Sequence, residues 1–372
     1  MQSLIKKIDW YICLPAIILC VFSLFTLASF GETSVRFIKQ LLWIILGVGL
    51  CGLMHYLDLS FLKNRKTVLL VYGLSIISLF LLFVSGHVAK GAQSWIRLGF
   101  LSIQPTDPAK IALIILLAKY FSKRHVEISA FRHVLVSAIY TGILGVLVLF
   151  QPDFGSAVTI FAIWFGMIFV SGISKKHLLL LFLCAVITFG AAWQFGFKDY
   201  QKKRVINFIH PMHDTRGSGY NQYQALIAVG SGQILGKGIG YGTQSKLRFL
   251  PEYQTDFIIA AFSEEWGFVG LMIVIILSGL MLGRMLYLAP RLQSNFDALC
   301  VAGIVFFLGT HMVINIGMNL GVMPVTGIPL PFMSYGGSHI LIEFIAIGIA
   351  SALLGQRKSI EARKSRNEFV GF

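Results

Sequence analysis

The sequence is short of charge. Only 13% of its 372 residues are charged, about half of the roughly 25% found in an ordinary globular domain. This excludes a single soluble domain, a coiled coil and an intrinsically disordered chain, because all three need more polar surface. Cysteine is also sparse, and the five cysteines lie inside apolar blocks with no CxxC pair. No disulfide framework is therefore indicated.

What the sequence has in abundance is apolar residues, at 56% of the chain with a mean hydropathy of +0.78. About 20 apolar residues are needed to cross a bilayer, and many blocks reach or approach that length. The pattern predicts an all-α, polytopic membrane protein forming one domain over residues 1–372, with about ten transmembrane helices. The predicted spans are 10–30, 38–57, 67–86, 108–121, 134–150, 153–171, 177–195, 256–286, 298–320 and 339–354. The eighth is too long for the bilayer, so we expect it to tilt, kink or project.

Basic residues outnumber acidic ones by 31 to 16, giving a net charge of +15. An even number of spans places both termini on one side, and the short loops on that side carry most of the lysine and arginine. Both termini, including a basic tail at about 356–372, are therefore predicted to be cytoplasmic. Because topology and attraction to anionic membrane lipid account for much of the charge, no nucleic-acid partner is predicted.

Two segments on the outer side stand out. The long extracytoplasmic loop 198–255, between the seventh and eighth spans, is rich in glycine and basic residues, and loops of this length are usually functional. The shorter loop 87–104 carries Trp95, Arg97 and Gln104, and its aromatic and basic stretch suits the headgroup layer. His210 and His213 offer only two potential ligands, so no metal site is predicted and a divalent cation stays an open question.

Ionisable residues at membrane depth are costly and therefore informative. Asp107 and Lys110 are three residues apart on one helical face, which predicts an ion pair, with contact to an anionic headgroup as the alternative. We expect Thr106 or Asp107 to cap that helix. Asp153 is predicted to cap the next but one.

Further acidic residues lie in the later spans. We expect Glu343 to pair inside the bundle, and Glu264 to be a supporting polar residue of the eighth span. For each of these carboxylates the alternative to a role in chemistry is an internal contact that holds helices together.

Asp256 differs because it stands where the basic loop meets the eighth span, just after Lys246 and Arg248. A carboxylate at a helix start can be a simple charge partner for the helix dipole. It can also be a general base at the outer interface, beside cations that hold a phosphate-bearing lipid headgroup.

The motifs together resemble the shape, elongation, division and sporulation (SEDS) family over nearly the whole chain. The matching stretches are Trp95-Ile-Arg-Leu-Gly99, Gln104-Pro-Thr-Asp-Pro-Ala-Lys110, Gln151-Pro-Asp-Phe-Gly155, Gly242-Thr-Gln-Ser-Lys-Leu-Arg-Phe-Leu-Pro-Glu252 with Thr255-Asp256-Phe257, Glu264-Glu-Trp-Gly-Phe268, and Gly321-Val-Met-Pro-Val-Thr-Gly-Ile-Pro-Leu-Pro331 with Ser334-Tyr335-Gly-Gly-Ser338. The Gly-Thr-Gln-Ser stretch favours the elongation branch. Three departures are visible: Thr106-Asp107 stands where the family usually reads Ser-Glu, Ser263 where Gly is common, and His339 follows the Ser-Tyr-Gly-Gly-Ser run.

The resemblance implies a ten-helix glycosyltransferase of the bacterial cytoplasmic membrane, which polymerises lipid II into glycan strands at the outer face. It also implies a class B penicillin-binding protein as partner, together with other proteins of the elongation machinery. Asp256 matches the essential aspartate of the family. The predicted roles are Asp256 as catalytic base; Lys246, Arg248, Lys110, Arg97, Trp95 and Gln104 as substrate-binding residues; and Asp107, Asp153, Glu264, Glu343, Ser334 and Tyr335 as supporting polar residues.

Two other functions compete with catalysis. A lipid II flippase would also have ten helices and a lipid-linked substrate, although transport needs polar groups distributed across the membrane thickness. A scaffold that only positions a penicillin-binding protein would tolerate any substitution at Asp256 that preserves the complex.

Overall fold

A computed structural model describes residues 8–29, 33–85, 87–89, 92–98, 101–123, 131–210, 217–247 and 249–369. Each of the ten predicted spans is a helix in this part of the chain. The helices are α2 (Trp10–Ser29), α3 (Thr33–Met54), α4 (Arg65–Ser85), α5 (Thr106–Ser122), α6 (Phe131–Phe150), α7 (Phe154–Val170), α8 (Lys175–Ala191), α12 (Ile258–Leu288), α13 (Asn295–Asn319) and α14 (Gly337–Phe369).

Eight of the described helical segments are long and apolar enough to cross a membrane by length and composition, and α7 is a shorter apolar helix. The eight lie in α2, α3, α4, α6, α8, α12, α13 and α14. The helix α5 has only 17 residues and carries Asp107, Lys110 and Lys119. The chain is thus a multi-pass membrane protein, and the total of ten spans stays a prediction.

Short elements connect these helices. They are η1 (Leu59–Lys63), β1 (His87–Ala89), β2 (Ala92–Leu98), β3 (Leu101–Ile103), η2 (Ala192–Gly196), α9 (Asp199–Ile209), α10 (Ser218–Ser231), α11 (Thr243–Lys246) and η4 (Ala289–Arg291). In the described part of loop 87–104, the three strands form an antiparallel sheet in the order β1-β2-β3. The sequence analysis did not foresee this sheet. The predicted loop 198–255 is also not a plain loop, since α9, α10 and α11 lie within it.

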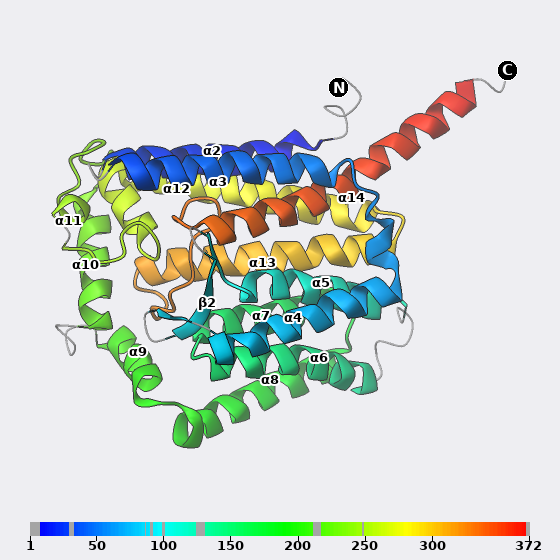
Figure 1. Cartoon of the computed structure of the whole chain (residues 1–372), viewed down its shortest axis with the longest axis horizontal. Coiled ribbons are helices and arrows are strands. Elements are labelled where there is room, and N and C mark those ends of the chain that lie inside the picture. The colour runs from blue at the N-terminus through cyan, green and yellow to red at the C-terminus, as the bar shows by residue number, and fades with distance from the viewer. Residues whose placement is uncertain are drawn as a thin grey trace.

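The core is built around α13, which contacts α5, α7, α12 and α14 and is buried along most of its length. On one side α3 lies against α14 and α2 against α12, and on the other α4 packs on α5 and α6 on α7 (Figure 1). By contrast, none of the residues Lys175–Ala191 of α8 is buried, although all of them are described. Its apolar side chains therefore face outward, as expected for a lipid-facing helix.

The two ends of the helical bundle differ. The start of α2 and the end of α14 lie at one end, and α9, α10 and α11 lie at the other (Figure 1). Residues 356–369 of the predicted tail continue α14 as a helix, which projects beyond the bundle in Figure 1. This separation is the arrangement expected if residues 198–255 face the opposite side of the membrane from both termini.

The long helix α12 contains a break at Gly267, whose φ of 68° and ψ of −166° are not helical. Segment 233–238 forms hydrogen bonds with the backbone groups on either side of the break. Phe268 N donates to Gln233 O (2.9 Å), and Lys237 N donates to Glu264 O (3.0 Å). Interrupted helices are tolerated in membranes only when such groups find partners. Of the three alternatives expected for the eighth span, a kink is therefore present, and a segment of the loop hydrogen-bonds to the backbone groups around it.

Local capping explains some helix starts and corrects one prediction. Asp153 caps α7 by accepting a hydrogen bond from Ser156 N (3.0 Å), as its position after Pro152 suggests. The prediction for α5 was wrong: its N-cap is Pro105, with no side-chain capping bond. Asp107 instead lies in the first turn, where its carboxylate contacts Lys110 and His339.

Candidate active site

Asp256 lies in the turn that leads into α12, where the sequence placed it. Phe257 N donates to Glu252 O (3.1 Å), which closes the turn. Two asparagines of α13 then fix the backbone of Asp256, because the side-chain amides of Asn315 and Asn319 donate to its carbonyl oxygen at 3.0 and 3.1 Å. The residue is thus anchored through its main chain to the central helix.

The carboxylate of Asp256 faces the segment 321–336, which joins α13 to α14. A Cβ atom built on Gly327 would lie 3.7 Å from Asp256 Oδ2, and Gly327 has a φ of +78°, which glycine adopts without strain. Asn315 also donates to Ile328 O at 2.8 Å, so one amide holds both segments. Asp256 itself is half-buried.

Ser334 and Tyr335 connect the segment 321–336 to the turn that precedes α12. The hydroxyl of Ser334 donates to Thr255 O (2.6 Å) and accepts from Leu330 N (2.8 Å). Tyr335 N donates to Gln254 O (2.8 Å). Burial raises the pKa of the Tyr335 hydroxyl, and the nearby charge of Arg36 opposes that rise. The two residues predicted as supporting therefore hold the backbone of the two residues that directly precede Asp256.

Two arginines near this turn were missed by the sequence analysis. Arg36 of α3 donates to Gln254 Oε1 at 2.8 Å, and Arg204 of α9 donates to Thr326 O at 3.2 Å. Thr326 directly precedes Gly327, so Arg204 contacts the residue next to the glycine that Asp256 faces. The basic loop was a visible signal, but nothing in the sequence distinguished Arg204 from the other cations of that loop.

Glu264 holds the glycine-rich segment that precedes Asp256. Its buried carboxylate accepts hydrogen bonds from Thr243 N (2.8 Å) and Gln244 N (3.1 Å) and pairs with Lys237 Nζ at 2.7 Å. Its neighbour Glu265 accepts from Gly240 N (3.0 Å). These contacts fix residues 237–244 to the first half of α12, so the two glutamates anchor this segment.

The predicted phosphate-binding cations are placed differently from one another. Lys246 is exposed at the end of α11, where its Nζ donates to Gly240 O (3.2 Å). Arg248 lies outside the described residues. Arg97 lies on β2 paired with Ser102, and nearby Trp95 is half-buried. The structure thus puts Lys246 two residues after the segment 237–244 that Glu264 anchors.

Lys110 belongs to a buried charge cluster between α5, α13 and α14. Its Nζ lies 3.0 Å from Asp107 Oδ1 and 3.3 Å from His311 Nε2. The ring of His339 lies between two carboxylates, with Nδ1 3.3 Å from Asp107 Oδ2 and Nε2 2.6 Å from Glu343 Oε1. The predicted Asp107–Lys110 pair and the internal partner for Glu343 are both present. A proton on the His339 ring would balance the charge of the second carboxylate in this apolar interior.

Gln104 and Asp153 lie beside this cluster. Gln104 Nε2 donates to Asp153 Oδ2 at 3.1 Å, and both line a cavity of about 30 Å³ together with Lys110 and Gly327. That volume suits an ordered water molecule and is too small for a sugar. Lys110 is 2% exposed, so in this conformation it contacts its ion-pair partner rather than a lipid headgroup. Gly327 borders both this cavity and Asp256.

Among the residues that the structure describes, no group of three or more histidine, cysteine, aspartate or glutamate side chains could hold a metal ion. Near the Asp256 turn the described structure also provides the cations Arg36 and Arg204.

Comparison with known proteins agrees with the motifs. The family model of the FtsW, RodA and SpoVE proteins, described as "Cell cycle protein", matches residues 2–359. The chain belongs to the SEDS family. The peptidoglycan glycosyltransferase MrdB of Escherichia coli (strain K12) is 35% identical over 290 residues, 78% of each chain. The probable peptidoglycan glycosyltransferase FtsW of Haemophilus influenzae is 39% identical over 284 residues, 75% of this SEDS chain and 71% of its relative.

Solved structures share the fold. One structure, described as "Structural coordination of polymerization and crosslinking by a peptidoglycan synthase complex", matches with a TM-score of 0.81 and 30% identity, covering 94% of this chain and 98% of that one. The crystal structure of the rod shape determining protein RodA of Thermus thermophilus matches with a TM-score of 0.70 and 28% identity, covering 93% and 96%. The predicted SEDS membership, the helical membrane fold and the glycosyltransferase class are thereby confirmed.

Proposed function

We propose that this protein polymerises lipid II into glycan strands at the outer face of the bacterial cytoplasmic membrane during cell elongation, with Asp256 as the general base. The glycosyltransferase class comes from the SEDS family and the names of its relatives. The observation that carries the residue assignment is the position of Asp256: a half-buried carboxylate at the α9–α11 end of the bundle, anchored by its main chain to α13 and facing Gly327.

In the proposed reaction, Asp256 accepts the proton of the 4-hydroxyl of the incoming GlcNAc. That oxygen bonds to the anomeric carbon of MurNAc, and the bond from this carbon to undecaprenyl diphosphate breaks. A general base matters because the hydroxyl is a weak nucleophile until it loses its proton. The leaving diphosphate takes the bonding electrons, so positive charge close to it lowers the barrier.

The cations proposed to hold the diphosphate are Lys246 and Arg248, with Arg97 as a further candidate. The structure adds Arg36 and Arg204, whose hydrogen bonds to Gln254 and Thr326 place them next to the Asp256 turn and Gly327. Arginine suits this role because its planar guanidinium matches phosphate oxygens in pairs.

Lys110, Gln104 and Asp153 have a positioning role in this proposal. They line the small cavity that Gly327 also borders, and Lys110 is fully paired inside the cluster. The cluster is therefore proposed to hold the segment 321–336 in position at Gly327, the residue that Asp256 also faces. Trp95 on β2 is proposed to contact the sugar or headgroup at the same end of the bundle.

A class B penicillin-binding protein is the proposed partner, because the matching synthase complex couples polymerisation to crosslinking. Both termini are proposed to be cytoplasmic, since α2 begins and α14 ends at the bundle end opposite α9–α11 and that end carries the positive-inside signal. The active site then faces outward, where the partner would crosslink the new strands.

The deciding experiment measures glycan polymerisation from purified lipid II by the full chain with its partner. Asp256→Asn keeps the size of the side chain and removes the base, so the rate should fall by about 10²–10⁴-fold. Asp58→Asn is the matched control: Asp58 is an exposed helix cap far from the site in sequence, and asparagine caps helices equally well. Wild-type polymerisation by Asp256→Asn would disprove the assignment.

The same variants separate the two competing functions. A flippase would keep moving labelled lipid II across reconstituted vesicles in the Asp256→Asn variant while making no glycan in either form. A scaffold would bind its partner and support crosslinking equally well in both forms. The proposed enzyme instead loses polymerisation and keeps partner binding.

A further inference from the structure

We propose that a groove between α2 and α12 binds an anionic phospholipid, with an acyl chain along its apolar floor and the phosphate beside Arg284. The groove has a volume of about 650 Å³, within the 300–1,000 Å³ range of pockets that hold small ligands. It lies along the first and eighth predicted spans, at the bundle end opposite α9–α11. It is therefore separate from the Asp256 site.

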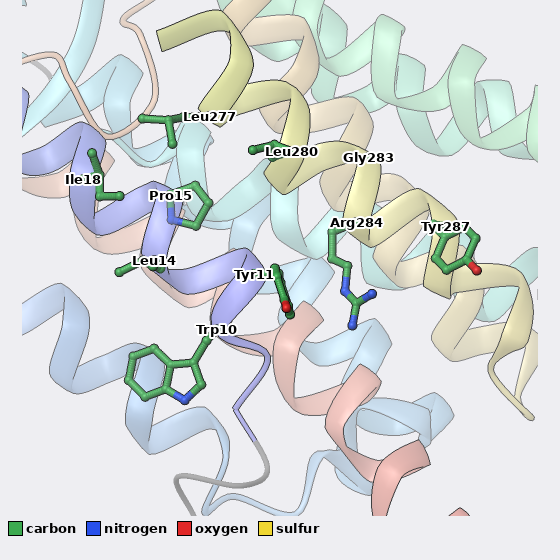
Figure 2. Close-up of a pocket in the computed structure, with 10 residues that line it drawn as sticks. All are labelled: Trp10, Tyr11, Leu14, Pro15, Ile18, Leu277, Leu280, Gly283, Arg284 and Tyr287. Carbon is green, nitrogen blue, oxygen red and sulfur yellow. The ribbon is translucent and has the colours of Figure 1, made fainter. Parts of the chain in front are cut away.

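The floor of the groove is apolar. Leu277 and Leu280 of α12 lie across from Pro15 and Ile18 of α2, and Leu14 extends the lining toward the end of the helix (Figure 2). At membrane depth such an apolar surface is covered by hydrocarbon, because the bilayer core contains no water. A lipid acyl chain has the matching chemistry.

Gly283 opens the groove in the wall formed by α12. A Cβ atom at this position would meet no atom within 4 Å, so the glycine leaves empty space that a larger side chain could fill without a clash. Gly279, one turn earlier on α12, is equally open but does not line the groove. The two glycines therefore offer a matched pair for testing.

One end of the groove carries charge and aromatic rings. The guanidinium of Arg284 lies 5.0 Å from the centroid of the Tyr11 ring and pairs with Asp9 at 3.2 Å, while its Nε has no hydrogen-bond partner among the described residues. Arg291 lies 3.8 Å over the ring of Tyr287, which also lines the groove. Among the described residues at this end, two guanidinium groups face one carboxylate, which leaves a positive charge.

This charge favours an anionic headgroup over a zwitterionic one. Basic pockets between transmembrane helices on the cytoplasmic side bind anionic headgroups, and arginine pairs well with phosphate. Trp10, Tyr11 and Tyr287 have the amphipathic rings typical of the headgroup level. The apolar floor and the cationic end thus match the two parts of one anionic phospholipid.

A transmembrane helix of a partner fits the groove less well. Close helix packing in membranes uses small residues on both faces. Here the lining is mainly leucine, isoleucine, tyrosine and tryptophan, with Gly283 as the one glycine among the described lining residues. Protruding side chains separated by a narrow space suit a flexible acyl chain.

The test is competitive lipid retention by the purified full-length protein, read by native mass spectrometry after incubation with equal amounts of phosphatidylglycerol and phosphatidylcholine. We expect wild type to retain phosphatidylglycerol about fivefold better, the effect of one arginine at an anionic membrane surface. Gly283→Leu should lower retention of both lipids by about fivefold or more, because the leucine side chain fills the groove and each displaced methylene of the acyl chain loses its apolar contacts. Gly279→Leu should retain lipid as wild type does.

A second variant tests the headgroup end alone. Replacing all three charged groups, Asp9→Asn with Arg284→Gln and Arg291→Gln, removes the positive charge and leaves no unpaired buried charge. This variant therefore decides the question even if Gly283→Leu fails to fold. It should bring the two lipids to about equal retention. Equal retention of both lipids by wild type, or equal losses in the two glycine variants, would overturn the proposal. So would a photocrosslinker at position 280 that captures a protein in cells instead of lipid.

Discussion

Asp107 Oδ2 on α5 lies 3.3 Å from His339 Nδ1 on α14, although the two residues are 232 positions apart in the chain. Where the family motif usually carries glutamate, the shorter Asp107 still reaches Lys110 at 3.0 Å with one oxygen and uses the other to contact His339. The imidazole continues to Glu343 on the same helix as itself. Two departures from the family pattern, Asp107 and His339, are therefore in direct contact.

This contact predicts a specific pattern of stability. His339→Gln removes the imidazole that lies between two buried carboxylates, and breaking a buried ion pair in this way costs about 3–5 kcal/mol. The unfolding midpoint of the purified protein should fall accordingly. Asp107 keeps Lys110 as its partner, so adding Glu343→Gln removes the one carboxylate left without a counter-charge, and the double variant should recover a large part of the loss. A single variant as stable as wild type would contradict the charge cluster.

Glu264 is predicted to keep the segment 237–244 in place. Glu264→Gln loses the charge that strengthens its bonds to Thr243 N, Gln244 N and Lys237 Nζ, each worth about 1.5–3 kcal/mol when one partner is charged. The segment should loosen, and trypsin should cut after Lys237 or Lys246 faster than in wild type. Asp58→Asn serves as the control. Unchanged cleavage would show that this carboxylate does not anchor the segment.

Gly267 is predicted to accept no side chain. Its φ of 68° and ψ of −166° belong to a region that is essentially restricted to glycine, and a Cβ atom would lie 2.3 Å from Gly236 N. Gly267→Ala should sharply lower the yield and unfolding midpoint of the purified protein. Gly279→Ala, on the same helix in open space, should be tolerated. Similar behaviour of the two variants would argue against the break as a required feature.

Arg204 is predicted to contribute to polymerisation, although the sequence analysis did not single it out. Arg204→Gln weakens the bond to Thr326 O and removes a cation near the Asp256 turn, and losing a charged hydrogen bond of this kind should slow the reaction by about 10–100-fold. Lys203→Gln makes the same change of charge at an exposed neighbouring position of α9. Equal effects of the two variants on polymerisation rate would mean that only the overall charge matters.

The sequence by itself determined the features that depend on local composition and spacing. Hydrophobic runs located the ten helices, and the three-residue spacing of Asp107 and Lys110 predicted their pair. The excess length of the eighth span predicted a tilt, a kink or a projection, of which the kink is present. Those signals are readable because hydrogen bonds and side-chain neighbours within a helix are only three or four residues apart. The motif set was equally local, and it sufficed to identify the family.

The tertiary structure alone decided which distant residues meet. It joined His339 to Asp107, brought Arg36 and Arg204 to the segments around Asp256, and placed α2 and α12 so that a groove opens between them. It also showed helices in residues 198–255 and a sheet in residues 87–103. Such contacts arise from the packing of segments hundreds of residues apart, and neither periodicity nor charge pattern along the chain specifies that packing.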